Sequence, residues 1–183
     1  MAFTTLDPVT ALVVIDMQKG IVALPTAHPI APVIAHVAEL VKAFRARGQP
    51  VVLVNVAGRA PGRTDAKNNF TPPPDWAVLI PELDQQPSDH TVTKLQLGAF
   101  HGTSLEQFLR RRGVTQIVLC GVATSVGVES TARTAYDHGF NVSLAIDAMT
   151  DLNADAHANS VERIFPRIGE SGLTADLIAL LSK

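Results

Sequence analysis

The sequence is poor in cysteine and in charge. Cys120 is the single cysteine among 183 residues, so an intramolecular disulfide is excluded and the fold requires no oxidising compartment. Charged residues make up 17% of the chain, and the formal net charge is −2 at pH 7. Such a chain has neither the basic surface of a nucleic-acid-binding protein nor the polybasic patch of a membrane-bound one.

Long apolar segments and cofactor motifs are also missing. No apolar run approaches the ~20 residues of a membrane-spanning helix, and the N-terminal MAFTTLDPVT lacks the basic and apolar regions of a signal peptide. The six histidines show no ligand spacing with a carboxylate, and no glycine-rich phosphate loop is present. We therefore expect a cytoplasmic protein with no metal or other cofactor, which binds neither nucleic acid nor membrane.

Short apolar runs alternate with helical patterns along the chain. Hydrophobic residues make up 46% of the sequence, enough for one well-buried domain over residues 1–183. Five runs predict strands, at residues 11–15, 51–56, 90–94, 115–120 and 141–146. Helical spacing with proline starts and glycine ends predicts helices, at residues 29–47, 104–112, 128–136, 154–164 and 173–181. This alternation predicts a three-layer α/β/α domain with a mostly parallel sheet.

The segment 115–138, TQIVLCGVATSVGVESTARTAYDH, joins a buried strand to a helix through a turn of small residues at 122–127. Backbone N–H groups at the start of a helix lack partners, and the helix dipole favours negative charge there. Two charged side chains, Asp16 and Lys94, stand at the ends of other predicted strands. The carboxyl ends of parallel strands meet at one edge, so we expect both to face this turn. The alternative is that each charge merely solvates the end of its strand.

A long segment at residues 57–87 is rich in proline and glycine and carries no clear helical or strand pattern. Loops of this length in compact domains often close over a site, although a surface excursion or an oligomer contact fits the pattern equally well. Arg59 and Arg63 lie in it, and they would serve either as an anion clamp or as ordinary surface residues.

Several motifs resemble the isochorismatase-like hydrolases, the cysteine hydrolase superfamily that includes nicotinamidases and N-carbamoylsarcosine amidases. The matching pieces are ALVVIDMQKG, the TK and GAF of TKLQLGAFHGTSL, IVLCGVATSVGVESTARTAYDHGF, and FPRIGE. The resemblance covers almost the whole chain in order. It implies a six-stranded parallel sheet with helices on both faces, hydrolysis of a small molecule, and assembly as a homo-oligomer, a dimer or a tetramer.

In that family the reactive residues are an aspartate, a lysine and a cysteine. Asp16 and Lys94 match the first two, but the cysteine of the G-V-x-T-x-x-C-V motif falls on Gly127, so the thiol is missing. The Asp-x-His metal motif of nicotinamidase-like members is also absent after residues 51–56. The resemblance further implies a set of substrate-binding residues, Gln18, Phe100, Val122, Ala123, Thr124 and Val126.

Two other nucleophiles deserve comparison with the missing thiol. Cys120 lies inside a strand, where a cysteine usually behaves as a small buried apolar residue, and its side chain would face the wrong layer. Ser125 lies in an A-x-S-x-G turn, a relaxed form of the nucleophile elbow. Asp147 or Asp151, followed by His157, would complete a serine hydrolase triad, and this alternative stays open.

Without a thiol, the covalent route of amide hydrolysis is lost. The true isochorismatases of the family also carry glycine here and cleave a vinyl ether, which requires an acid and water. By this resemblance Asp16 would be the acid, Lys94 would bind or orient an anionic group, and the amides of residues 123–128 would hold a carboxylate.

Two points count against a direct transfer of that activity. A nearby lysine lowers the pKa of an aspartate, so burial must outweigh Lys94 if Asp16 is to act as an acid. True isochorismatases also show a glutamine after the second strand, whereas this chain has Asn55-Val56-Ala57. The leading hypothesis is a hydrolase of a small anionic or carbonyl-bearing metabolite, and the competing one is a non-catalytic protein that binds a small molecule.

Overall fold

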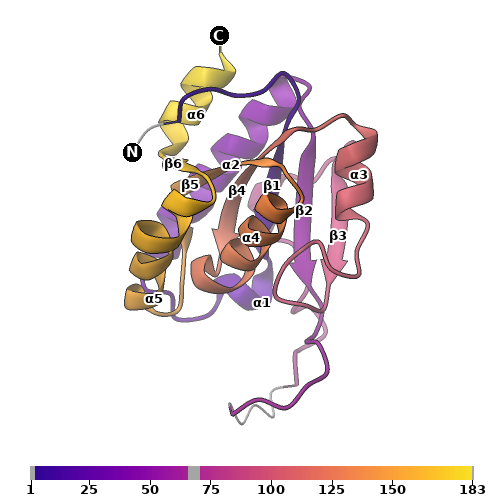
Figure 1. Cartoon of the computed structure of the whole chain (residues 1–183). Helices are drawn as coiled ribbons and strands as arrows, with labels where there is room; N and C mark the ends of the chain where they lie inside the picture. The colour runs from indigo at the N-terminus through magenta and orange to yellow at the C-terminus, as the bar shows by residue number, and fades with distance from the viewer. Residues whose placement is uncertain (1–2, 66–70, 183) are drawn as a thin grey trace.

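The computed structural model describes residues 3–65 and 71–182. Its centre is a six-stranded sheet with the strand order β3-β2-β1-β4-β5-β6 (Figure 1). All five strand pairings are parallel, which confirms the predicted α/β/α class. The strands are β1 (Thr10–Ile15), β2 (Val51–Val56), β3 (His90–Lys94), β4 (Gln116–Val122), β5 (Asn141–Thr150) and β6 (Glu170–Gly172).

Helices cover both faces of this sheet (Figure 1). One face is covered by α2 (Ile30–Ala46) and α6 (Thr174–Leu181), with the short α1 (Lys19–Val22) and the turn η1 (Pro81–Leu83) beside them. The other face is covered by α3 (Leu105–Arg111), α4 (Glu129–Asp137), and the helical stretch α5 (Ala154–Asn159), η3 (Ser160–Ile164) and η4 (Phe165–Arg167). In the described ranges, no helix has the length and apolar character needed to cross a bilayer.

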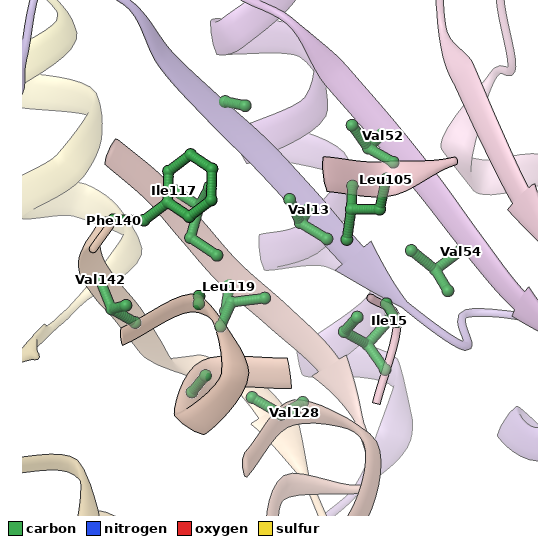
Figure 2. Close-up of a cluster of buried hydrophobic side chains, with 14 of the residues drawn as sticks. Val13, Ile15, Val52, Val54, Leu105, Ile117, Leu119, Val128, Phe140 and Val142 are labelled. Carbon is green, nitrogen blue, oxygen red and sulfur yellow. The ribbon is translucent and has the colours of Figure 1, made fainter. Parts of the chain in front are cut away.

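Alternation along the buried strands explains why two separate cores form. Successive strand side chains point to opposite faces, so Val13 and Ile15 pack toward α3 and α4, whereas Leu12 and Val14 pack toward α2. Figure 2 shows the first of these cores, with side chains of β1, β2 and β4 meeting Leu105 of α3. Both faces of the central strands are therefore buried, as their continuous apolar runs predict.

The structure adds elements that the residue pattern did not predict. The sixth strand, β6, is only three residues long, and α1 only four, so neither carries a readable period. The predicted strand 141–146 continues to Thr150 as β5. Asp147 therefore does not end the strand; its Oδ1 accepts hydrogen bonds from the backbone N (2.8 Å) and the hydroxyl (2.9 Å) of Thr174 at the start of α6.

The sheet order reverses between β1 and β4, which are neighbours in space although β2 and β3 separate them in sequence. Gly121 near the end of β4 permits this approach, because its φ is +116° and a Cβ there would lie 2.0 Å from the carbonyl oxygen of Ile15. Residues that follow β4 are thereby held against the end of β1. In parallel α/β sheets this reversal point is where ligands bind.

Candidate active site

A cavity of about 620 Å³ opens at the carboxyl edge of the sheet, next to the ends of β1 and β4. Its volume lies within the range of small-molecule sites. It is lined by Asp16, Ile21, Leu24, Val56, Gly58, Arg59, Ala60, Pro61, Gly62, Thr64, Lys94, Leu95, Gln96, Leu97, Val122, Ala123, Val126, Gly127 and Leu152. Most of these side chains are aliphatic, so the few polar groups among them stand out.

Asp16 lies at the floor of this cavity, directly after β1. Its φ is +52°, a left-handed conformation that aspartate and asparagine tolerate better than most residues. The backbone is fixed there by hydrogen bonds from Asp16 N to Val54 O (2.9 Å) and from Gln18 N to Asp16 O (2.8 Å). The residue is 5% exposed, and Oδ1 is buried without a hydrogen-bond partner among the described residues.

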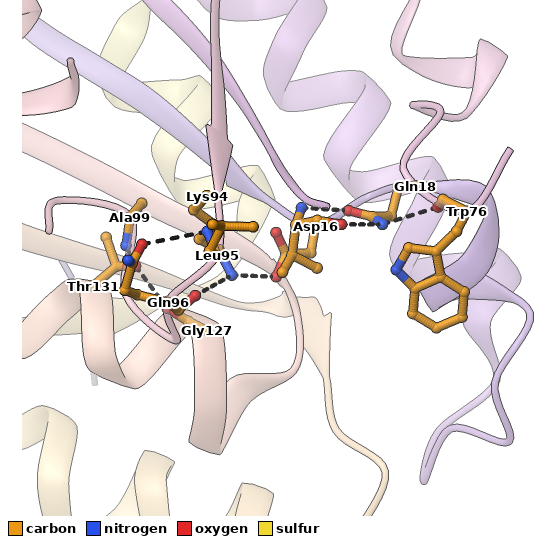
Figure 3. Close-up of polar contacts among 10 residues, drawn as sticks. Asp16, Gln18, Trp76, Lys94, Leu95, Gln96, Ala99, Gly127 and Thr131 are labelled. Atoms are coloured by element: carbon orange, nitrogen blue, oxygen red, sulfur yellow. Dashed lines mark hydrogen bonds and ion pairs between the residues drawn. The ribbon is translucent and has the colours of Figure 1, made fainter. Parts of the chain in front are cut away.

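Lys94, the last residue of β3, reaches Asp16 past the end of β2. Its Nζ donates to Asp16 Oδ2 at 2.7 Å and to Gln96 O at 3.3 Å, and the residue is 3% exposed (Figure 3). The structure thus brings together the two charged residues that the strand ends predicted to meet. It excludes the alternative that they solvate two separate strand ends.

Burial and the lysine act on the Asp16 carboxyl in opposite directions. Burial raises its pKa by disfavouring the charged form, while the Lys94 charge and hydrogen bond lower it. Burial is the largest of these effects, and the pKa of Asp16 rises from 3.8 to about 6. About a tenth of Asp16 therefore remains protonated at pH 7, and a general acid acts through this fraction.

This raised pKa predicts a pH-dependent contribution to stability. In the folded state Asp16 holds its proton up to about pH 6, whereas the unfolded chain loses it near 3.8. Its stabilising contribution is complete below the unfolded pKa and is lost as the pH rises through the folded one. Relative to Asp16→Asn, the wild type is expected to lose about 2 kcal/mol of unfolding free energy between pH 4 and pH 7.

Urea unfolding of the two proteins at matched pH values measures this difference. Titrating groups distant from Asp16 are shared, so their contributions cancel in the comparison. A difference that stays constant across this pH range would show that burial does not raise the Asp16 pKa.

Gly127 also lies beside Asp16, in the wide helical turn η2 (Thr124–Val128) that leads into α4. A Cβ at this position would lie 3.3 Å from Asp16 Oδ2 and 2.8 Å from Ile15 Cγ2. The hydroxyl of Thr131 donates to Gly127 O (2.7 Å) and accepts from Ala99 N (3.0 Å), as Figure 3 shows. The turn is thereby tied to the loop that follows Lys94.

The six substrate-binding residues implied by the resemblance divide into two groups. Val122, Ala123 and Val126 line the cavity, and the remaining three do not. Phe100 is buried beside Phe140 and His138.

Gln18 and Thr124 are also held in other contacts. Gln18 is fully buried and connects backbone segments: its Oε1 accepts from Val56 N (2.7 Å), and its Nε2 donates to Val56 O (3.0 Å) and Trp76 O (2.9 Å). The hydroxyl of Thr124 lies 2.9 Å from His157 Nδ1. Gln18 therefore holds the cavity wall in place instead of facing a ligand.

The serine alternative is not supported by this geometry. His157 Nδ1 contacts Thr124, and Asp151 Oδ2 accepts from the backbone N of Ser125 at 2.6 Å, so neither forms a triad with the serine hydroxyl. Asp147 is held by the start of α6, as described above, and Ser125 does not line the cavity.

Cys120 is also no candidate for a nucleophile. It is fully buried in the core beneath α2, where burial raises the pKa of its thiol. Its side chain points away from the face of the sheet that Gly127 shares with α4, as the strand alternation predicted.

The long segment 57–87 consists of two differently held parts, and its residues 66–70 lie outside the described structure. Residues 58–62 and 64 line the cavity. Residues 76–80 are instead bound to the chain after β1, for example by Gly20 N to Trp76 O (3.1 Å) and Lys19 N to Val78 O (2.8 Å). The loop arginines also differ, because Arg59 lines the cavity and Arg63 does not.

Sequence reasoning missed several other aliphatic residues of the cavity. Leu95, Leu97 and Leu152 lie on loops after predicted strands, and nothing in their local pattern separates a cavity wall from ordinary loop residues.

The described side chains do not gather into a metal site. Across residues 3–65 and 71–182, no group of three or more histidine, cysteine, aspartate or glutamate side chains could hold a metal ion.

The fold and the cavity define an α/β protein with a small-molecule site, built on a buried carboxylate–lysine pair at the reversal point of a parallel sheet. Comparison with known proteins identifies its family. A model of the isochorismatase domain matches residues 10–176. The isochorismatase family protein YwoC of Bacillus subtilis (strain 168) is 41% identical over 177 residues, 92% of each chain.

Two further matches agree. The isochorismatase family protein YecD of Escherichia coli O157:H7 is 45% identical over 170 residues, which cover 87% of this chain and 89% of that one. The solved structure of an isochorismatase family protein from Burkholderia thailandensis has a TM-score of 0.93 at 44% identity and covers 98% of both chains. The chain therefore belongs to the isochorismatase family, and it is a hydrolase of the isochorismatase type that acts on a small molecule.

Proposed function

We propose that this hydrolase uses Asp16 as a general acid and needs no covalent nucleophile. The observation that carries the proposal is the carboxyl pKa of about 6, which burial maintains although Lys94 Nζ lies 2.7 Å away. Oδ1 of the same carboxyl is buried without a hydrogen-bond partner among the described residues, which further disfavours its ionised form. An acid in this position fits the cleavage of a vinyl ether on a small anionic or carbonyl-bearing metabolite.

The proposed reaction begins with proton transfer from Asp16 to the vinyl carbon, which leaves an oxocarbenium ion. Water adds to this cation and returns a proton to the Asp16 carboxylate, and the resulting hemiacetal separates into an alcohol and a carbonyl product. Lys94 stabilises the carboxylate that exists between the two proton transfers. The backbone amides of Ser125, Val126 and Val128 already donate to Asp151 Oδ2 and Ala123 O, so these three are not free to hold a carboxylate of the substrate.

The pH dependence of turnover tests this role. A broad metabolite screen at enzyme excess identifies a substrate, and kcat/KM is then measured from pH 5 to pH 8. Because the acid form of Asp16 is required, we expect kcat/KM to fall about tenfold per pH unit once the pH exceeds its pKa. A rate that stays level or rises across this range would contradict general acid catalysis by Asp16.

A second function, ligand binding without turnover, is favoured by one observation. Gly127 supplies no nucleophile to the cavity, although its Cα lies next to the acid. A binding protein would retain ligand and yield no product under the enzyme-excess conditions of the screen. Any product whose formation depends on Asp16 excludes this second function.

We also propose that the protein works in the cytoplasm as a homo-oligomer, a dimer or a tetramer. The resemblance to the family supports association. Sedimentation of the full chain measures the assembly. We expect a mass at least twice that of one chain, and a monomer at micromolar concentration would exclude it.

A further inference from the structure

The charges that line the cavity do not balance. Among the described lining residues, Asp16 carries the negative charge, and Lys94 and Arg59 carry positive charges. Lys94 is not available to a ligand anion, because its Nζ is already paired with Asp16 Oδ2 at 2.7 Å and both side chains are buried. At pH 7 Asp16 is mostly ionised, so the pair is neutral as a unit and the net charge of the cavity comes from Arg59.

Arg59 lies at the exposed rim, on the part of segment 57–87 that borders the cavity. Its Nη2 has a weak contact to the hydroxyl of Thr64 at 3.5 Å, and within the described structure no carboxylate pairs with it. A guanidinium in this state offers several donors in a planar fork, an arrangement that suits a carboxylate. The rim therefore holds a cation without a counter-charge.

The walls between the rim and the floor are aliphatic. Leu95, Leu97, Val126 and Leu152 line the cavity, yet each remains at least 42% exposed, and Leu97 reaches 64%. Exposed apolar surface concentrated around one opening indicates a binding site, because covering it with an apolar ligand gains the free energy of removing it from water. A ligand of matching chemistry has an apolar body and a single charged end.

From this layout we infer that the hydrolase recognises an amphiphilic monoanion, whose carboxylate pairs with Arg59 at the rim and whose apolar body lies along the leucine-lined walls. The inference rests on the proposed site, since it places the reacting bond at the floor beside Asp16. Arg59 is then the residue that determines specificity for charge. Lys94 keeps its role in setting the electrostatics of the acid and does not bind the anion.

Calorimetric titration of the full-length protein with three probes tests the inference. Octanoate has both an apolar body and a carboxylate, octanamide lacks the charge, and acetate lacks the body. We expect octanoate to bind up to about fivefold more tightly than octanamide, the effect of one exposed ion pair, and acetate to bind more weakly still. Added salt should weaken octanoate binding and leave octanamide unchanged.

Matched variants test whether Arg59 causes the preference for octanoate over octanamide. Arg59→Gln is expected to remove the preference for octanoate over octanamide, whereas Arg63→Gln, on the same segment but outside the cavity lining, is expected to keep it. Leu97→Glu places a negative charge at the rim and should weaken octanoate more than octanamide. All three positions are exposed, so the fold tolerates these changes.

The inference is overturned if octanoate does not bind, if octanamide or acetate binds as tightly, or if Arg59→Gln keeps the preference. These binding measurements need no turnover, so the inference and the proposed reaction fail separately. Loss of turnover in Asp16→Asn with unchanged charge preference in Arg59→Gln would reject the inference alone. Full turnover in Asp16→Asn with an Arg59-dependent preference would reject the acid alone.

Discussion

Replacing Asp16 by asparagine is expected to lower kcat by about 10²- to 10⁴-fold, the range that general acid catalysis contributes. Asparagine keeps the shape of the side chain and tolerates the left-handed backbone at this position, where φ is +52°. It has no proton to deliver to a substrate from its oxygen. The loss should appear in kcat more than in KM, because the proton is transferred in the transition state.

Asp84 offers a matched control for that substitution. Within residues 3–65 and 71–182 it is the other non-glycine residue with positive φ, at +44°, and it lies at the end of η1 and outside the cavity lining. Asp84→Asn therefore makes the same chemical change in the same backbone conformation, and kcat should be unchanged. Full turnover of Asp16→Asn on the substrate found by the screen would exclude the proposed mechanism.

Replacing Gly127 by cysteine is expected to create a thiol that iodoacetamide modifies completely under conditions in which the wild type remains unmodified. The new Cβ would stand 3.3 Å from Asp16 Oδ2, within reach of a base, and at the start of a helix that stabilises a thiolate. The native Cys120 is fully buried with a raised pKa, so it contributes no background. Intact mass and peptide mapping after timed alkylation give the rate and the site.

Three further variants separate the reactivity of a thiol at position 127 from the energetic cost of placing a side chain there. The Cβ lies 2.8 Å from Ile15 Cγ2, so insertion costs about 1–3 kcal/mol, and Gly127→Ala measures that cost without a thiol. Gly62→Cys, where a Cβ meets nothing within 4 Å, gives the reactivity of an ordinary loop thiol. Asp16→Asn in the Gly127→Cys background should slow alkylation. If position 127 reacts no faster than position 62, the surroundings of Gly127 do not activate a nucleophile.

The sequence predicts the fold well because its central strands are buried on both faces. Continuous runs such as ALVVI at 11–15 leave no ambiguity about a strand, and Gly48 marks the end of α2 as expected. Short elements were not predictable, because the three residues of β6 carry no period. Asp147 was mistaken for a strand end, since a charged residue after an apolar run looks solvated. Its partner, Thr174, lies 27 residues further along the chain.

The positions of the site residues were predictable where the topology of the sheet alone determines them. Asp16 and Lys94 are 78 residues apart, yet parallel strands bring their ends to one edge, and their contact follows. Side-chain direction was not predictable. Gln18 stands two residues after Asp16 and looks equally available, but its amide is used by the backbone of Val56 and Trp76. Local sequence also does not show which of the two loop arginines lines the cavity, because this depends on the path of the loop in the folded protein.

The burial of the single cysteine also determines how sensitive the protein is to oxidation by peroxide. A hydrolase that relies on an activated thiolate is inactivated when that sulfur is converted to sulfenic or sulfinic acid. Here the only sulfur of this kind, at Cys120, lies beneath α2 with none of its surface exposed, and Gly127 has no side chain to modify. An Asp16-based mechanism would therefore continue to operate during oxidative stress that silences thiol-dependent hydrolases.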